Sequence, residues 1–427
     1  MRHTCRLSLT LSAALALLAA APMAQSAAPP SSSMRPLRID AGRLARLDPV
    51  LQEFVDKNQI AGAVALVLQD GKPVYDKAFG WRDKEAGVKM TTDSLFRIAS
   101  QTKAITSVAV LMLMEEGRIG LMDPVSRFIP AYEKTKVITR LEDGGTQIRP
   151  AKRPIAIKDL LTHTAGISYG VSEEVGEMYE SKALGPAAGY GWYLADKDEP
   201  VCDSMERLAS LPFVAQPGEA WVYGYNTDIL GCVVERASGM PLDRFFQTRI
   251  FEPLGMKDTF FFVPQDKKDR LVTVYANTRD DLLVRAPDGA RGQGHYVSGP
   301  RRNFAGGAGL VSTARDYTRF LEMVRGDGAI GDVRLLAPRT VALMTHNQSG
   351  MLHGVDLGYS LAFETTEHVG GNGLDPVGAY GWGGAYGSVY RVDPSARLVL
   401  ALMLNQLPNF TDIRSKFQTL VHQAIVY

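Results

Sequence analysis

The chain has 427 residues, of which 45% are hydrophobic and 22% charged, and its formal net charge at pH 7 is +1. This composition is ordinary for a soluble globular protein, and the balanced charge gives no reason to expect nucleic acid or an anionic surface as a partner. Single hydrophobic cores stop growing below this length, so we expect two structural units.

The first residues have the three-part layout of a secretory signal peptide. Arg2, His3 and Arg6 precede the apolar run LSLTLSAALALLAAA, and small residues follow it. This run is too short to span a bilayer comfortably, and no later stretch reaches about 18 apolar residues. We expect a signal peptide at 1–27, a linker at 28–36, and an exported protein, periplasmic or secreted, without a stable membrane anchor.

The chain beyond the signal has two cysteines, Cys202 and Cys232. An oxidising compartment permits a disulfide between them. However, Cys232 lies in the apolar helical stretch DILGCVVERASG, where a lone buried thiol is common, and this setting favours separate thiols. Neither cysteine has a partner at the spacing of metal ligands, so we expect no metal site.

Both ends of the folded part predict strand pairs beside a helix. Residues 41–58 (AGRLARLDPVLQEFVDKN) predict a helix, and 62–80 predict a hairpin that turns at Asp70-Gly71. Residues 387–406 (GSVYRVDPSARLVLALMLNQ) predict two strands around a turn at DPSA, and a final helix is expected within 417–427. We therefore expect an α/β fold, with one antiparallel sheet built from both termini and flanked by helices.

The middle of the chain, residues 155–302, predicts helical segments separated by long loops. The loops at 173–200 and 278–303 are too long for plain connectors and are expected to be lids or binding loops. We expect this part to be a mostly helical domain, inserted between residues 37–154 and 303–427 of an α/β sandwich.

Two short patterns offer a nucleophilic serine. The stretch GISYG, residues 166–170, fits the G-x-S-x-G nucleophile elbow, in which a strand enters the serine turn and a helix leaves it. A helix-like stretch precedes Gly166 instead, and no strongly periodic apolar stretch follows, so the context argues against Ser168. Ser100 is followed by the apolar run AITSVAVLMLMEEG, which predicts a long buried helix that ends at Gly117. Ser100 would then lie at the start of this helix or in its first turn.

The tetrapeptide SQTK places Lys103 over the same helical face as the hydroxyl of Ser100. The unpaired N–H groups of a first helical turn also favour developing negative charge there. A serine needs a neighbouring base to become a nucleophile. The alternative, an N-cap serine followed by a surface lysine, is the commoner fate of S-x-x-K, but this is the only such pattern in the chain.

Several stretches, taken together and in order, resemble one known superfamily. They run from about Gly62 to the C-terminus and comprise FRIASQTKAITSVAVLMLMEEGRIGLMDPV, IKDLLTHTAGI, QPGEAWVYGYNTDILGCVVERASG, IFEPLGMKDTFF, GGAGLVSTARDYTRF and GWGGAYGSVYRVDP. The chain resembles the serine β-lactamase and penicillin-binding-protein superfamily, most closely the family VIII carboxylesterases, which are class C β-lactamase-like hydrolases. The resemblance implies a β-lactamase-like sandwich with a helical domain and an active site between them.

The resemblance also implies catalytic roles. Ser100 matches the nucleophile and Lys103 its lysine partner. Tyr223 falls where the family has the tyrosine of its Y-x-N or Y-S-x motif and, activated by Lys103, would take the serine proton. Tyr223 is preferred to Tyr225 because its spacing to Asp228 fits the esterase pattern.

The stretch GWGGAYG matches the K-T-G region of lactamases, with Trp382, Gly383 and Gly384 at those three positions. By resemblance, the N–H groups of Ser100 and Ala385 would bind the oxyanion. No metal or organic cofactor is implied. His163 in LLTHTAG needs no catalytic role in this scheme and is expected to be structural.

Two departures from the lactamase pattern bear on the substrate. Tyr225 replaces an asparagine, and Trp382 replaces a cation that would hold a substrate carboxylate. Losing both polar contacts makes an anionic β-lactam a poorer fit, whereas an aromatic wall suits an apolar group. We expect Tyr225, Trp382 and the adjacent glycines to contact substrate.

The sequence thus predicts a serine hydrolase that cleaves small-molecule carboxylic esters. The alternatives are a β-lactamase, a D-amino-acid peptidase or amidase, or an acyltransferase on the same scaffold, and an inactive binding homologue. The oligomeric state is left open.

Overall fold

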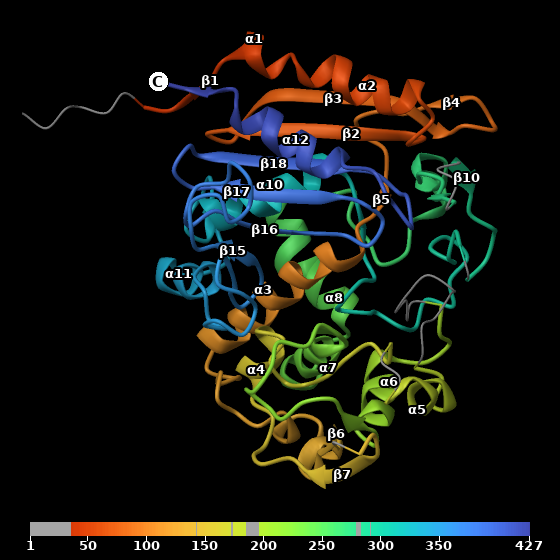
Figure 1. Cartoon of the computed structure of the whole chain (residues 1–427), viewed down its shortest axis with the longest axis vertical. Coiled ribbons are helices and arrows are strands. Elements are labelled where there is room, and N and C mark those ends of the chain that lie inside the picture. Colours follow the sequence, from red (N-terminus) through yellow and green to blue (C-terminus); the bar gives the residue numbers. More distant parts are fainter. Residues whose placement is uncertain (1–35, 142, 172–173, 185–195, 279–282, 291) are drawn as a thin grey trace, which may run out of the picture. The chain divides into compact units, whose positions relative to one another are not determined.

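An eight-stranded antiparallel sheet, in the order β14-β15-β16-β17-β18-β2-β3-β4, joins strands from both ends of the chain (Figure 1). The computed structural model describes residues 36–427 except 142, 172–173, 185–195, 279–282 and 291, and these residues form one unit. The strands are β2 Gly62–Gln69, β3 Lys72–Asp83, β4 Val88–Lys89, β14 Leu357–Tyr359, β15 Glu364–Thr366, β16 Tyr380–Gly383, β17 Val389–Asp393 and β18 Leu398–Met403. The expected α/β fold with a sheet built from both termini is confirmed.

Two predicted hairpins supply the middle of the sheet. β2 and β3 are joined by Asp70 and Gly71, whose φ angles of 52° and 72° are both in the left-handed region. A two-residue turn of this kind matches the twist of paired strands. β17 pairs along its whole length with β18 around the second predicted turn.

Helices cover both faces of the sheet. Along β2, Ala63, Ala65 and Val67 pack in one apolar cluster with α2 and α12, while the alternate residues pack in a second cluster with α3 and α10. Burial on both faces explains why β2 is continuously apolar. The helices around the sheet are α1 Ala41–Leu44, α2 Leu47–Asp56, α3 Thr102–Glu115, α10 Ala314–Arg325, α11 Pro338–Thr345 and α12 Ile413–His422.

Two predicted helices have different bounds in the structure. The helix expected at 41–58 is divided into α1 and α2. The last helix, α12, begins before the predicted stretch and ends at His422, and Ile425–Val426 forms strand β19, which pairs with Arg38–Ile39 of β1. This pairing joins the two ends of the chain, so a local pattern could not show it.

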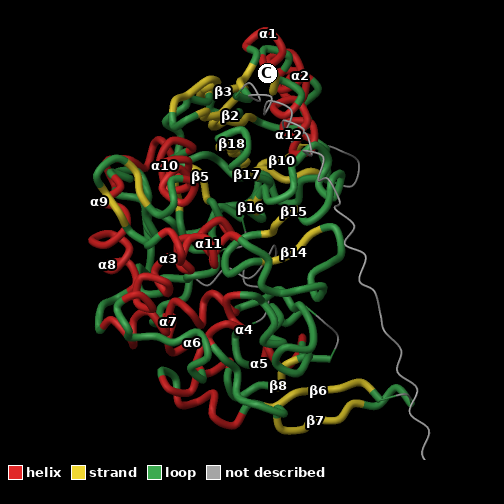
Figure 2. Tube along the Cα trace, turned by 90° about the vertical axis from the view of Figure 1, so that its left-hand side faces the viewer, coloured by secondary structure: helices red, strands yellow, loops and turns green. Residues whose placement is uncertain are grey.

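The middle of the chain carries short helices and a small sheet. Its elements are α4 Ile157–Leu161, α5 Gly176–Ser181, α6 Val201–Leu208, α7 Asn226–Ser238, α8 Leu242–Phe246, α9 Glu252–Leu254, β6 Lys136–Arg140, β7 Thr146–Pro150 and β8 Pro212–Phe213. The β6–β7 hairpin lies at the end remote from the large sheet (Figure 2). β6 pairs with β8 across the boundary expected at residue 155, and the division into two domains stays a prediction.

The structure corrects the expectation for the cysteines. Cys202 of α6 and Cys232 of α7 form a disulfide with a Cα–Cα distance of 4.9 Å. The sequence favoured separate thiols, which was wrong because the packing of two helices brings the sulfur atoms together. A bridge depends on this distance, which a local pattern does not contain.

The expected signal peptide, residues 1–27, lies outside the described residues. Within the described ranges, no helix is long and apolar enough to cross a membrane. The same part of the chain has no group of three or more His, Cys, Asp or Glu side chains arranged to hold a metal ion.

Candidate active site

Ser100 lies where the chain enters the long buried helix α3. It is the middle residue of a short 3₁₀ turn, Ala99–Gln101, that runs directly into α3. Ala99 has a φ of 45°, which non-glycine residues rarely adopt and which often accompanies a functional site. One helical turn later, Lys103 Nζ donates a hydrogen bond to Ser100 Oγ at 3.2 Å. The nucleophile and lysine expected from SQTK are thus in direct contact.

The amine of Lys103 is enclosed by oxygen atoms. It also donates to the hydroxyl of Tyr169 at 2.9 Å and to the carbonyl oxygen of Gly307 at 2.7 Å, and the side chain is almost fully buried. Three acceptors satisfy the three N–H bonds of an ammonium group. An ammonium group held by these contacts can stabilise negative charge that develops on Ser100 Oγ.

Tyr223 lies in the loop before α7 and lines the same pocket as Ser100. Its hydroxyl accepts a hydrogen bond from Trp382 Nε1 at 3.1 Å, and Lys103 Nζ lies 4.8 Å from its ring centroid. Tyr223 and Trp382, which are 159 residues apart in the sequence, are thus in contact in the pocket that Ser100 lines.

The turn between β16 and β17 brings Ala385 to the pocket that Ser100 lines. Gly384 packs against the segment before Ser100 so closely that a Cβ there would lie 2.6 Å from the carbonyl oxygen of Ile98. Among the described residues, no backbone acceptor is found for the N–H groups of Ser100 and Ala385. Both residues line the pocket, and two N–H donors on such residues are the kind of pair that an oxyanion hole uses.

Comparison with known proteins agrees with this arrangement, since residues 47–423 match the Beta-lactamase family. The chain belongs to this family. Protein Rv1367c of Mycobacterium tuberculosis is 35% identical over 84% of this chain and 90% of its own length. Esterase EstB of Burkholderia gladioli is 33% identical over 86% of this chain and 92% of its own.

Solved structures show the same fold. "EstCE1, a hydrolase with promiscuous acyltransferase activity" has a TM-score of 0.73 and 26% identity, covering 90% of this chain and 98% of its own. Family membership, the esterase relative and this structural neighbour together identify the chain as a serine hydrolase of the Beta-lactamase family.

The sequence reasoning missed Tyr169, which lies in the site of this β-lactamase-family protein. Its hydroxyl accepts from Lys103, and its ring centroid is 5.6 Å from that of Tyr223. Burial raises the pKa of Tyr169 well above its ordinary range, so its phenol stays protonated and is unsuited to act as a base. Tyr169 is the tyrosine of GISYG, next to Ser168, so the sequence pattern that indicates a serine site already contained it. Ser168 itself does not line the pocket, and its Oγ accepts from the N–H of Gly170.

Tyr225 does not lie in the substrate pocket, which corrects its expected role. Its side chain is fully buried, and its hydroxyl donates to the carbonyl oxygen of Leu184 at 2.8 Å. The ring packs against Tyr169 and Tyr179. Tyr225 immediately precedes the first residue of α7, and the start of this helix turns it inward while Tyr223 faces the pocket.

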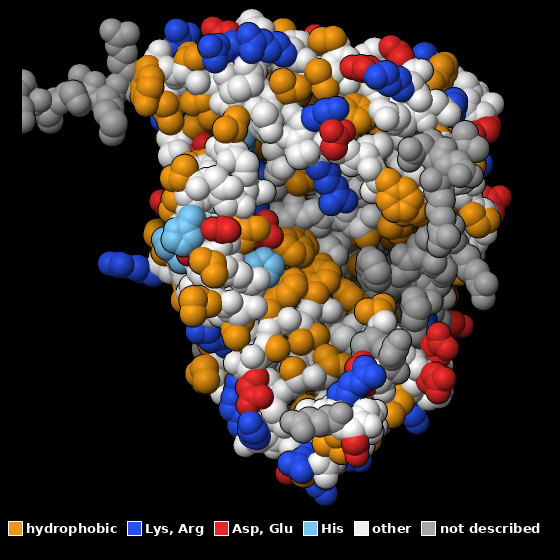
Figure 3. Space-filling model, in the orientation of Figure 1, with side chains coloured by type: hydrophobic (Ala, Val, Ile, Leu, Met, Phe, Trp, Pro, Cys, Tyr) orange, Lys and Arg blue, Asp and Glu red, His pale blue; other side chains and the backbone are white. Residues whose placement is uncertain are grey.

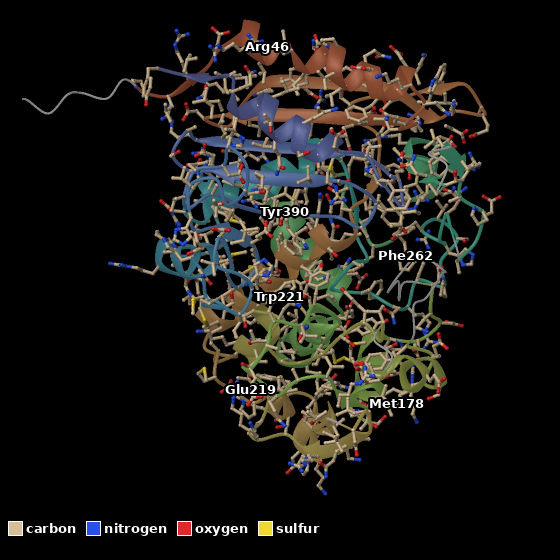
Figure 4. All side chains as sticks on the ribbon, in the orientation of Figure 1. Arg46, Met178, Glu219, Trp221, Phe262 and Tyr390 are labelled. Carbon is tan, nitrogen blue, oxygen red and sulfur yellow. A yellow bond between two sulfur atoms is a disulfide. The ribbon has the colours of Figure 1, made fainter. Side chains whose placement is uncertain are left out.

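His163 supports the aromatic wall around Tyr223. Its ring lies 4.8 Å from that of Tyr223, and its Nδ1 is hydrogen-bonded to Asn226 Nδ2 at 2.9 Å. Burial lowers the pKa of His163 well below its ordinary range, so the imidazole is neutral. This position agrees with the expected structural role. Trp221 also stacks on Tyr223, with its ring centroid 5.9 Å from that of His163, and lies in the middle of the face shown in Figure 4.

A buried carboxylate, Asp228, is linked to Lys103 through Gly307. Its Oδ1 accepts from the N–H of Gly307 at 3.0 Å, and the carbonyl oxygen of Gly307 accepts from Lys103. Burial raises the pKa of Asp228 to about 6, and the charge of Lys103 opposes this rise. Asp228 is therefore mostly ionised at neutral pH and balances the lysine charge. A Cβ on Gly307 would lie 2.3 Å from Asp228 Oδ2, so only glycine fits there.

We expect Asp228→Asn to stabilise the protein at pH 8 but not at pH 4. The pKa is raised on folding from 3.8 to about 6, so the folded state holds the proton more tightly than the unfolded state. Stability thus falls as the pH rises from 4 to 6, by up to about 3 kcal/mol in total. An asparagine side chain can still accept a hydrogen bond from the N–H of Gly307, and it does not carry the cost of ionising a buried carboxyl group. Urea unfolding at both pH values measures the effect, and equal changes at pH 4 and pH 8 would contradict it.

The pocket in front of Ser100 has a volume of about 400 Å³. Trp382 and Val389 are apolar parts of its lining, and its polar part comes from Glu364, Asn372, Arg391, Arg414 and Gln418. In Figure 3, apolar side chains gather in the middle of the drawn face, where the surface is hollowed. This volume is within the range of small-molecule pockets.

Proposed function

We propose that this protein hydrolyses small carboxylic esters in two steps through an acyl-enzyme on Ser100. The observation that supports this proposal is the contact of Ser100 with a Lys103 whose three N–H bonds are all used, beside Tyr223 in one pocket. Lys103 supplies positive charge in this arrangement, and Tyr223 supplies the base.

In the first step the Tyr223 phenolate takes the proton of Ser100 as Oγ attacks the ester carbonyl. The carbonyl oxygen becomes an oxyanion that accepts hydrogen bonds from the N–H groups of Ser100 and Ala385. When this intermediate collapses, the C–O bond to the alcohol breaks and Tyr223 returns its proton to the departing oxygen. The alcohol leaves, and the acyl group remains on Ser100.

In the second step water attacks the acyl-enzyme, and Tyr223 takes the proton from the water. The second oxyanion collapses, the bond to Ser100 Oγ breaks, and Tyr223 protonates that oxygen. The acid product leaves, and the phenolate is restored. Lys103 keeps its three hydrogen bonds throughout, so its charge compensates each anionic species without a proton transfer of its own.

Two observations favour an ester over a β-lactam. Trp382 occupies the position where lactamases carry a lysine, and an indole cannot neutralise a carboxylate. EstB and EstCE1, both similar over most of this chain, are described as an esterase and a hydrolase. Because EstCE1 also carries the description of promiscuous acyltransferase, acyl transfer to an alcohol is the second candidate, with the alcohol replacing water in the second step.

The proposal is tested by comparing p-nitrophenyl esters of increasing acyl length with a chromogenic cephalosporin. We expect kcat/KM for the best ester to exceed that for the cephalosporin, and the reverse order would contradict ester hydrolysis. Adding an alcohol and measuring the ester and acid products separates transfer from hydrolysis. Absence of turnover and of an acyl-enzyme with every substrate would instead indicate an inactive binding protein.

We expect Trp382→Phe and Trp382→Ala to separate two functions of the indole. Trp382→Phe keeps an apolar face but removes the donor to Tyr223. A hydrogen bond to a charged group contributes about 1.5–3 kcal/mol, so kcat should fall about 10- to 100-fold with little change in KM. Trp382→Ala also removes the wall of the pocket and should raise KM, most for bulky neutral esters. Equal kinetics of the two variants would contradict this division.

A further inference from the structure

Arg414, at the start of α12, holds the turn that carries Ala385. Its Nη2 donates to the carbonyl oxygen of Gly384 at 3.1 Å, and its Nε donates to that of Gly387 at 2.8 Å. Arg414 also lines the pocket of Ser100. No carboxylate of the described residues forms an ion pair with it, so its charge acts on this turn and on the pocket.

Contacts from two sides define the position of this turn. On one side, Arg414 bonds the carbonyl oxygens of Gly384 and Gly387, and the N–H of Gly387 also donates to the oxygen of Gly384. On the other side, Gly384 lies so close to Ile98 that no side chain fits between them. Ile98 is two residues before the nucleophile, so the same contacts set the distance between the turn and Ser100.

The bond from Arg414 to Gly384 has an electrostatic consequence for Ala385. The carbonyl of Gly384 and the N–H of Ala385 belong to one planar peptide group. A cation that donates to the oxygen of such a group polarises it and makes its N–H a stronger donor. The charge of Arg414 thus strengthens the N–H donor of Ala385, a residue that lines the pocket.

We propose that Arg414 is a positioning residue of the reaction, which holds and polarises the Gly384–Ala385 peptide so that its N–H stabilises the oxyanion. This inference rests on the proposed function, in which Ala385 donates to that oxyanion. Arg414 acts through the peptide and not through a contact with substrate. Its effect should therefore appear in the transition state and be nearly absent from substrate binding.

The first experiment compares Arg414→Gln and Arg414→Lys with Lys416→Gln, a control on the exposed side of the same helix. Three quantities are measured: kcat and KM for a neutral p-nitrophenyl ester, and inhibition by phenylboronic acid, which forms an anionic tetrahedral adduct on a catalytic serine. We expect Arg414→Gln to lower kcat and the affinity for phenylboronic acid by about 10- to 100-fold each, with KM nearly unchanged. Arg414→Lys should retain part of the wild-type kcat and part of the affinity for phenylboronic acid. Lys416→Gln should have the wild-type values of both quantities.

A second experiment adds guanidinium chloride or urea to Arg414→Ala. Guanidinium should restore part of the lost kcat, whereas urea, of similar shape but uncharged, should not. If Arg414→Ala does not fold, the kinetics and the phenylboronic acid inhibition of Arg414→Gln and Arg414→Lys test the inference. Unchanged affinity for phenylboronic acid in Arg414→Gln would overturn the inference. So would a defect confined to the KM of carboxylate-bearing esters, which would make Arg414 a substrate-binding residue. A wild type that neither cleaves esters nor binds phenylboronic acid would refute the proposed function itself.

Discussion

Ser100→Ala is expected to lower ester hydrolysis by at least about 10³-fold and to abolish covalent labelling by a phosphonate. Ser100 lines the pocket and its hydroxyl accepts from Lys103, and among the described residues no backbone acceptor is found for its N–H or for that of Ala385. Without this hydroxyl no acyl-enzyme can form, and only slow direct attack of water on the bound ester remains. Steady-state kinetics and mass spectrometry of the labelled protein measure the two effects.

The matched control for this prediction is Ser168→Ala, in the pattern that resembles a nucleophile elbow. Ser168 is buried and accepts a hydrogen bond from the N–H of Gly170, so it contributes to the local turn. Labelling should survive this substitution, with at most a modest loss of stability. A phosphonate found on Ser168 in the wild type would show that the assignment of Ser100 is wrong.

Tyr223→Phe is expected to lower kcat by about 10²–10⁴-fold while the protein remains folded. The substitution removes the phenol oxygen that accepts from Trp382 and that we propose as the base. The aromatic ring remains, so its packing against His163 and Trp221 is kept. Single-turnover kinetics with an activated ester and circular dichroism separate the loss of chemistry from a loss of structure.

Two neighbouring tyrosines provide controls of different severity. Tyr169→Phe removes one of the three acceptors of Lys103 and should cost about tenfold in kcat, since a hydrogen bond to a charged group is lost. Tyr225→Phe removes a buried bond to Leu184 and should lower the free energy of unfolding by about 1 kcal/mol with little effect on kcat. A loss in Tyr169→Phe as large as in Tyr223→Phe would transfer the role of base to Tyr169.

Features that depend on neighbours in the chain were predictable from the sequence. The turn at Asp70-Gly71 needs two residues that tolerate a left-handed backbone, and the pattern shows them directly. The contact of Ser100 with Lys103 follows from the spacing of residues on a helix, which is the same in every protein. The order of several motifs along the chain then identified the family, because many weak patterns in one order are specific together.

The surroundings of the nucleophile could be known only from the tertiary structure. The other two acceptors of Lys103 lie 66 and 204 residues further along the chain. The disulfide joins two helices, and Arg414 reaches the turn near Ala385 from the last helix. In each case the interaction depends on how separate elements pack. A hydrogen bond or a disulfide forms only within a few ångströms, and local periodicity contains no information on distances between elements.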